Sequence, residues 1–179
     1  IGVYSMASLL PYFFNGEFRA EDIDVLCGTL TGYSKAASFR TADIAGLDVL
    51  AHVASNLYPT IPDDEQREIF NLPSSFLTMV QNGLIGNKSG KGFYKKVQTK
   101  SGREFHVINP NTLDYEPQKK TEFDSLKQAK AIKRLDDRLN FLVNSDTREG
   151  HFVWEVQRQL MLYAANRVPE ISNSIEAVD

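Results

Sequence analysis

Few side chains in this sequence are of types that carry out covalent chemistry, and they lie far apart. The histidines stand at His52, His106 and His151, so their spacing forms no metal-binding motif. Cys27 is the single cysteine, which excludes a disulfide framework and a multi-cysteine metal site, and we expect it to be a small buried apolar residue. His52 follows Asp48 by four residues, so a charge-assisted hydrogen bond between the two side chains is possible. Because the sequence offers no nucleophile nearby, we interpret His52 as a structural residue.

A glycine-rich segment, residues 86–92, raises the question of a phosphate-binding loop. The spacing of a nucleotide-binding P-loop is absent, because glycine rather than serine or threonine follows Lys91. The dinucleotide fingerprint also fails, since Lys95 stands where its last glycine is required. We therefore interpret the segment as a tight turn whose glycines supply positive φ angles before a strand.

The composition is that of an ordinary folded protein. The sequence has 179 residues, of which 42% are hydrophobic and 24% charged, so a core can form without disulfide or metal support. A net charge of -3 argues against a general nucleic-acid binder. No apolar run approaches the ~18 residues of a membrane span, and no signal peptide pattern is present. We expect no nucleic-acid or membrane partner, and the single cysteine fits a reducing, cytoplasmic location.

The positions of Gly and Pro divide the first half of the chain into predicted helices. Residues 1–14 are apolar nearly all round, which predicts a buried helix, and Pro11 should kink it. Residues 19–26 form a second, short helix that carries several acids. A loop rich in glycine, threonine and serine follows at residues 28–38.

A longer helix is predicted after this loop. Thr41 can cap it, and Asp43 would lie in its first turn, where the helix dipole favours an acid. The helix runs to about Tyr58 and contains Gly46, which suggests that another group packs closely there. Pro73 opens the next helix.

The pattern changes in the second half of the chain. The pattern of residues 93–99 and 103–109 predicts two strands that form a hairpin. Residues 117–121 are polar and indicate a linker, and helices are predicted at residues 124–145 and 152–168.

The last helix resembles the first at an offset of 155 residues. Met6 then aligns with Met161, Glu21 with Glu176, and Asp24 with Asp179. In both places an apolar helix precedes an acid-x-aliphatic-Asp element, which suggests an internal repeat whose second copy is cut off. Because the chain opens at Ile1 within an apolar segment, we also expect it to be a piece of a longer polypeptide.

Two motifs in order carry a family resemblance, at residues 39–48 and 83–94. They resemble the F-x-x-x-D-x-x-G-L-D helix and the G-x-K-x-G-x-G-F-Y/W turn in the C-terminal domain of the 3-hydroxyacyl-CoA dehydrogenase family. The resemblance covers residues 1–96, and the tail from Phe152 resembles the beginning of a second copy. Residues 28–35 are similar to multidomain bacterial and archaeal forms, which join a nucleotide-binding domain, two helical repeats and an enoyl-CoA hydratase module.

The resemblance implies a mainly α fold, like the C-terminal domain of 6-phosphogluconate dehydrogenase, with a small β-hairpin and a partial second helical repeat. We expect a helical domain at residues 1–97, a hairpin and linker at 98–122, and the truncated second repeat at 123–179. A dehydrogenase of the 6-phosphogluconate type shares the broad architecture but does not explain the turn before Tyr94.

The function implied is NAD-dependent oxidation of 3-hydroxyacyl-CoA to 3-oxoacyl-CoA in fatty-acid β-oxidation. In the family a His–Glu pair of the Rossmann domain acts as the base and its orienter. This chain contains neither that pair nor a Rossmann fingerprint, so no catalytic residue is expected in it, NAD would be bound by a domain absent from it, and it should be inactive alone. The implied partners are an acyl-CoA substrate, the Rossmann domain of the same full-length chain, and further copies in a homo-oligomer.

The loop at residues 32–39 corresponds to the family's acyl-facing loop, which implies four substrate-contacting residues: Tyr33, Ser34, Lys35 and Phe39. Lys35 could instead meet a CoA phosphate or be a solvated loop lysine. The sequence assigns no role to Lys88. The alternative function is a non-catalytic helical interaction module of the same shape.

A truncated second repeat would leave apolar helix faces exposed. We expect such a face at Val153, Leu160 and Met161, with self-association through it.

Overall fold

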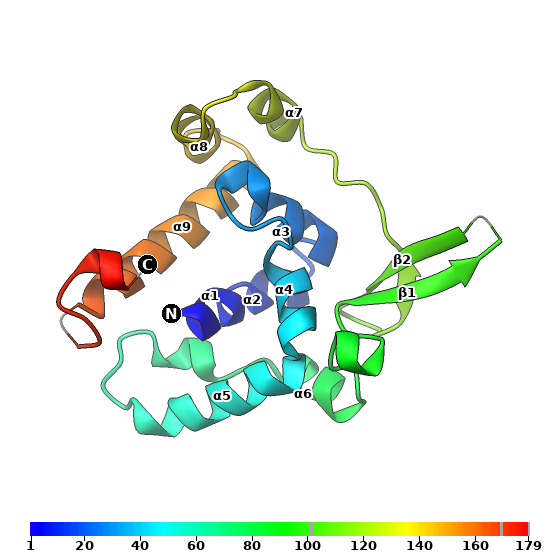
Figure 1. Cartoon of the computed structure of the whole chain (residues 1–179), viewed down its shortest axis with the longest axis horizontal. Helices are drawn as coiled ribbons and strands as arrows, with labels where there is room; N and C mark the ends of the chain where they lie inside the picture. The colour runs from blue at the N-terminus through cyan, green and yellow to red at the C-terminus, as the bar shows by residue number, and fades with distance from the viewer. Residues whose placement is uncertain (101, 169, 179) are drawn as a thin grey trace.

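Helices surround a shared apolar core, and a small antiparallel sheet projects to one side of it (Figure 1). The structure is a computed structural model that describes residues 1–100, 102–168 and 170–178. The predicted mainly α fold with a small hairpin is confirmed. Ser101 of the predicted hairpin turn and Asp179 of the predicted repeat lie outside the described residues.

The apolar N-terminal segment forms two short helices, α1 (Gly2–Ala7) and α2 (Leu10–Phe14). The predicted kink is present, but the helix already breaks before Pro11, which lies in the first turn of α2. Pro11 has no N–H and its ring crowds the carbonyl four residues earlier, so the preceding helix ends at Ala7. Phe13 is fully buried at the centre of the core.

The middle of the chain contributes α3 (Ala20–Leu26), α4 (Ser38–Ala45), α5 (Leu47–Thr60) and α6 (Ser74–Gln81). Helices α3 and α4 pack against each other beside the first helices, and α5 runs along one edge (Figure 1). The short helix expected at residues 19–26 and the helix opened by Pro73 are confirmed.

The predicted long helix after the loop is wrong in three details. Thr41 does not cap it, because α4 begins at Ser38 and Thr41 lies inside the helix. Asp43 consequently lies in the last turn rather than the first. Gly46 has φ 105° and ψ 124°, a conformation that only glycine adopts readily, and it divides the expected helix into α4 and α5.

The sheet consists of β1 (Tyr94–Thr99), β2 (Gly102–Ile108) and β3 (Tyr115–Pro117) in that spatial order. Strands β1 and β2 pair antiparallel, with Tyr94 opposite Val107, which confirms the predicted hairpin. The third strand was not predicted, because three residues ending in proline are too short to show a strand pattern.

The C-terminal part forms α7 (Asp124–Ala131), α8 (Leu135–Val143) and α9 (Arg148–Asn166). The helix predicted at residues 124–145 is therefore broken in two. Helix α9 begins four residues earlier than expected because Thr147 caps it, accepting a hydrogen bond from Gly150 N at 3.1 Å. None of the described helices combines the length and the apolar character needed to cross a membrane.

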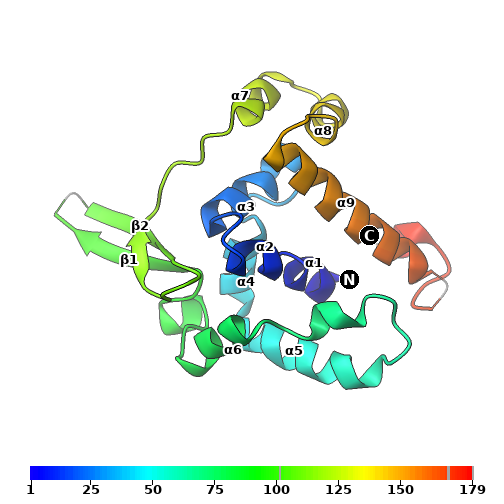
Figure 2. The same ribbon diagram turned by 180° about the vertical axis from the view of Figure 1, so that it is seen from behind.

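Helix α9 packs along α1 and α2, as the view from behind shows (Figure 2). The Tyr163 ring stacks on the Tyr4 ring with 3.8 Å between centroids. Val153 is buried, so the prediction that it contributes to an exposed face is wrong, whereas Met161 is 64% exposed. Residues of α7 to α9 share one hydrophobic core with the first helices. The predicted domain division near residue 122 stays a prediction.

Candidate functional site

The two sequence motifs meet at the carboxylate of Asp43. This side chain is 2% exposed and accepts hydrogen bonds from Phe93 N at 2.8 Å and Tyr94 N at 2.9 Å. The Phe39 ring stacks on the Phe93 ring, with centroids 4.1 Å apart. The first motif is thus fastened to the second by one carboxylate and one ring pair, and we call this contact the clasp.

The glycines of residues 86–92 allow the clasp to close. A Cβ atom on Gly92 would lie 2.0 Å from Asp43 Oδ1, and one on Gly86 would lie 2.3 Å from the Asp43 carbonyl oxygen. Backbone hydrogen bonds join Gly86 and Lys91 in both directions across the turn. These contacts support the interpretation of the segment as a tight turn that packs closely.

Lys88 and Asp48 tie the turn to the start of α5. Lys88 Nζ lies 2.6 Å from Asp48 Oδ1 and beside Gly46, where a Cβ atom would lie 2.9 Å from the ammonium. The hydrogen bond from Lys88 holds the pKa of Asp48 below its usual value. Asp48 does not bond to His52, whose Nε2 instead lies 3.0 Å from Asn56 Nδ2. The close group expected at Gly46 is therefore Lys88.

A second carboxylate, that of the partly buried Asp24 of α3, fixes the start of α4. It accepts hydrogen bonds from Phe39 N at 2.6 Å, Arg40 N at 3.1 Å and the Tyr94 hydroxyl at 2.8 Å. The Arg40 guanidinium lies over the Tyr94 ring, 4.7 Å from its centroid, and its charge partly offsets those of Asp24 and Asp43. The loop before α4 is therefore held by the same carboxylate that holds the strand after the turn.

Burial raises the pKa values of Asp24 and Asp43 from 3.8 to about 6. A folded-state pKa above the unfolded value means that the folded protein holds these protons more tightly. Their contribution to stability is therefore complete below about pH 4 and is lost as the pH rises through about 6.

We accordingly expect the pH dependence of stability to change in the Asp24→Asn variant, whose amide cannot ionise. The stability of the natural chain relative to this variant should fall by up to about 3 kcal/mol between about pH 4 and about pH 7. Urea unfolding followed by circular dichroism over this range measures the difference. A relative stability that rises with pH would show instead that the three hydrogen bonds hold the pKa of Asp24 low.

The loop between α3 and α4 is also anchored at its beginning. Thr31 Oγ1 donates a hydrogen bond to Leu26 O at 2.6 Å, and Arg138 Nε of α8 donates to Leu30 O at 2.5 Å. With Asp24 holding the far end, the segment around Tyr33 keeps a fixed position.

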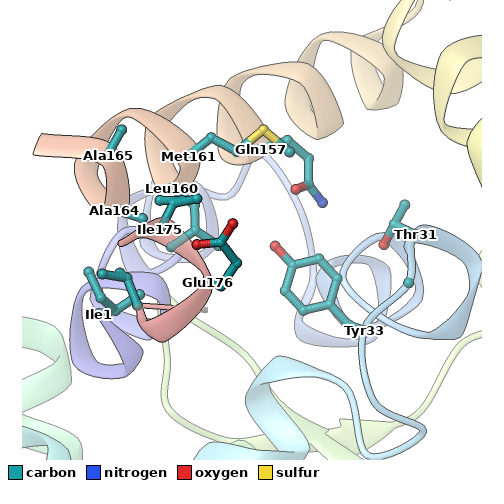
Figure 3. Close-up of a pocket in the computed structure, with 12 residues that line it drawn as sticks. Ile1, Thr31, Tyr33, Gln157, Leu160, Met161, Ala164, Ala165, Ile175 and Glu176 are labelled. Carbon is teal, nitrogen blue, oxygen red and sulfur yellow. The ribbon is translucent and has the colours of Figure 1, made fainter. Parts of the chain in front are cut away.

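Tyr33 extends from this loop into an open cavity of about 670 Å³ between the loop and α9 (Figure 3). The polar lining is Thr31, Tyr33, Gln157 and Glu176. The remaining lining side chains are apolar: Ile1, Leu160, Met161, Ala164, Ala165, Ile175 and Val178. A cavity of this size and polarity suits a largely apolar small molecule that carries a few polar groups.

The Tyr33 hydroxyl is the central polar group of this cavity. Figure 3 shows it turned toward Gln157 and Glu176. Burial raises the pKa of Tyr33 to about 12, so the group stays a neutral hydroxyl. Gln157 lies close enough to lower that pKa, but the buried hydroxyl oxygen makes no hydrogen bond of normal geometry.

The structure brings only one of the four predicted substrate-contacting residues to this cavity. Ser34 and Lys35 are exposed, and Lys35 borders a separate hollow of about 200 Å³ beside Arg40. Phe39 is 1% exposed and stacks in the core, because it lies on the inner face of α4. The α9 residues of the cavity were missed, since nothing local in residues 152–168 shows which loop that helix will face.

The ionisable groups of the cavity lining are the Tyr33 hydroxyl and the Glu176 carboxylate. No histidine lines it, and no cluster of candidate metal ligands occurs within residues 1–100, 102–168 and 170–178. The described strands form one antiparallel sheet, so the described part of the chain offers no parallel βαβ unit that would fit a dinucleotide. The lining therefore offers a ligand both apolar contacts and a few polar groups.

Sequence comparisons connect the clasp to one family. The family model described as the 3-hydroxyacyl-CoA dehydrogenase C-terminal domain matches residues 5–96, which include both motifs. A relative from Bacillus subtilis, named a probable 3-hydroxyacyl-CoA dehydrogenase, is 36% identical over 179 residues, which cover 100% of this chain and 22% of the relative.

Two further relatives agree with this match. A protein of Deinococcus radiodurans with the same name is 40% identical over 103 residues, covering 58% of this chain and 29% of the relative. A protein of Rickettsia prowazekii, named as a trifunctional enzyme of a fatty acid oxidation complex, is 27% identical over 158 residues, covering 88% of this chain and 20% of the relative. The chain thus spans less than a third of the length of these relatives. No solved structure matches it.

Proposed function

Because the chain belongs to the 3-hydroxyacyl-CoA dehydrogenase family through that family's C-terminal domain, we propose that it forms one wall of the thioester cleft of an NAD-dependent enzyme. The enzyme would oxidise 3-hydroxyacyl-CoA to 3-oxoacyl-CoA. The cavity beside Tyr33 is the observation that carries the proposal. It joins an apolar wall to a few polar groups, a combination that suits an acyl thioester.

The role of these residues in the reaction would be to position the substrate and exclude water. An acyl group held against Leu160 and Ala164 is removed from solvent, and Tyr33 can orient its oxygen atoms. NAD⁺, bound by another domain, would accept the hydride. A nucleotide-binding domain of the same polypeptide would also supply the group that takes up the hydroxyl proton.

We also propose that the enzyme is a homo-oligomer and works in the cytoplasm, where the free Cys27 would stay reduced. The exposed apolar side chains of α9 support an assembly surface, since Trp154 is 50% exposed and Leu162 is 52% exposed.

The experiment measures NADH formation from 3-hydroxyacyl-CoA and NAD⁺ by the complete polypeptide and by this chain alone. We expect activity only in the complete polypeptide. Tyr33→Ala should raise KM about tenfold, or about 1.4 kcal/mol. Lys35→Ala is the control, because Lys35 borders a different hollow and should leave KM nearly unchanged.

Two results would contradict this proposal. NADH formation by the chain alone would show that it does more than shape the cleft. A complete polypeptide that oxidises no 3-hydroxyacyl-CoA would favour the non-catalytic interaction module.

A further inference from the structure

The cavity is polar at one end and apolar at the other. Tyr33, Gln157 and Glu176 mark the polar end, while Leu160, Ala164 and Ile1 surround the apolar end (Figure 3). We propose that the apolar end holds the alkyl tail of the acyl group and that Ala164 sets the longest chain accepted. This inference rests on the proposed function and adds chain-length selection to it.

The lining residues of α9 form a straight track. Gln157, Leu160 and Ala164 follow one another at spacings of three and four, so they share one helix face. From Gln157 to Ala164 the helix advances about 10 Å. An extended chain of about eight carbons covers that distance, because each C–C bond of about 1.5 Å advances less than its own length. A four-carbon acyl group would leave Ala164 untouched.

The track cannot collapse into the empty space, because the opposite side of α9 is fixed. The Tyr163 ring stacks on Tyr4, and Arg167 Nη1 lies 2.5 Å from Asp64 Oδ2. The Arg167 side chain is 11% exposed, so this ion pair is shielded from water. Position 164 bears only a methyl group, so a larger residue there would project into the apolar end of the cavity.

The apolar lining gives chain length a measurable effect. Each methylene moved from water to an apolar surface is worth about fourfold in binding. For substrates that share the same thioester, kcat/KM should therefore rise with each added methylene until the track is full. Ala164→Leu places a larger, branched side chain at the apolar end of the cavity. The rise of kcat/KM should therefore stop at a shorter acyl chain.

The test compares kcat/KM of the complete polypeptide for 3-hydroxybutyryl-CoA, 3-hydroxydecanoyl-CoA and 3-hydroxypalmitoyl-CoA. Ala164→Leu should lower the value for the long substrates about tenfold or more and leave that for 3-hydroxybutyryl-CoA unchanged. The matched control is Ala131→Leu, which adds the same bulk to an exposed helical position outside the cavity. Unchanged turnover of the short substrate also shows that the variant folds.

Several results would overturn the inference while leaving the proposed function intact. The first is that kcat/KM of the natural enzyme does not rise from 3-hydroxybutyryl-CoA to 3-hydroxydecanoyl-CoA. This measurement needs no variant. Others are an Ala164→Leu enzyme with an unchanged chain-length profile, or one with equal losses for all three substrates. If no 3-hydroxyacyl-CoA is oxidised at all, the proposed function fails, and the inference fails with it.

Discussion

Replacing Asp43 with alanine is expected to lower the free energy of unfolding by about 3 kcal/mol. The carboxylate accepts hydrogen bonds from the backbone N–H groups of Phe93 and Tyr94, and all three residues are buried. Alanine leaves both N–H groups without a partner and opens a gap where Gly92 packs on Asp43. Removing the buried charge of Asp43 recovers part of the lost stability. The cost of leaving two buried N–H donors unpaired is larger than this gain.

Urea unfolding of the natural chain and the variant measures this difference. Asp63→Ala is the matched control, because Asp63 is exposed and should change stability by less than about 0.5 kcal/mol. If the two variants were equally stable, the Asp43 carboxylate would not hold the two motifs together. The turn and the helix would then be joined mainly by the stacking of Phe39 on Phe93.

The clasp gives the two sequence motifs a structural explanation. Their acidic and glycine residues suggest chemistry when read along the chain, yet Asp43 and Gly86 face each other in the interior. Asp24 extends the same contact to the start of α4. The clasp therefore orients the loop that carries Tyr33, and the motifs would act on the substrate only through this loop.

Local patterns predicted the helices and the hairpin because their signals lie within a few residues. The apolar periodicity of residues 1–14 and the alternation of residues 93–99 are examples. The break at Gly46 was missed because a glycine within a helical pattern is usually tolerated. A Cβ atom at Gly46 would meet the side chains of Asp48 and Lys88, and Lys88 lies more than forty residues further along the chain.

The candidate site was harder to predict than the fold, because its two walls are far apart in sequence. The loop around Tyr33 was found through the family resemblance. Gln157 and Ala164 belong to a helix more than 120 residues later, and its packing beside the loop follows from ring contacts such as Tyr4 with Tyr163. No pattern within either segment encodes that pairing, so sequence reasoning identified one wall only.

Replacing Gly86 with alanine should have a still larger effect than the change at Asp43, lowering the free energy of unfolding by more than about 4 kcal/mol. Gly86 has φ 96° and ψ -153°, a region that is essentially restricted to glycine. Its Cβ would also lie 2.3 Å from the carbonyl oxygen of Asp43. Backbone atoms cannot move aside as a flexible side chain does, so the clasp itself would have to open.

Gly90→Ala separates these two causes, because it keeps a positive φ but removes the clash. Gly90 has φ 75°, and nothing lies within 4 Å of an added Cβ. Strain alone should cost about 1–2 kcal/mol there. Thermal unfolding of both variants against the natural chain provides the comparison. Equal losses would mean that backbone conformation alone requires these glycines. A loss at Gly86 that is larger by several kcal/mol, and that does not add to the loss from Asp43→Ala in the double variant, would show that the glycine is required by contact with the first motif.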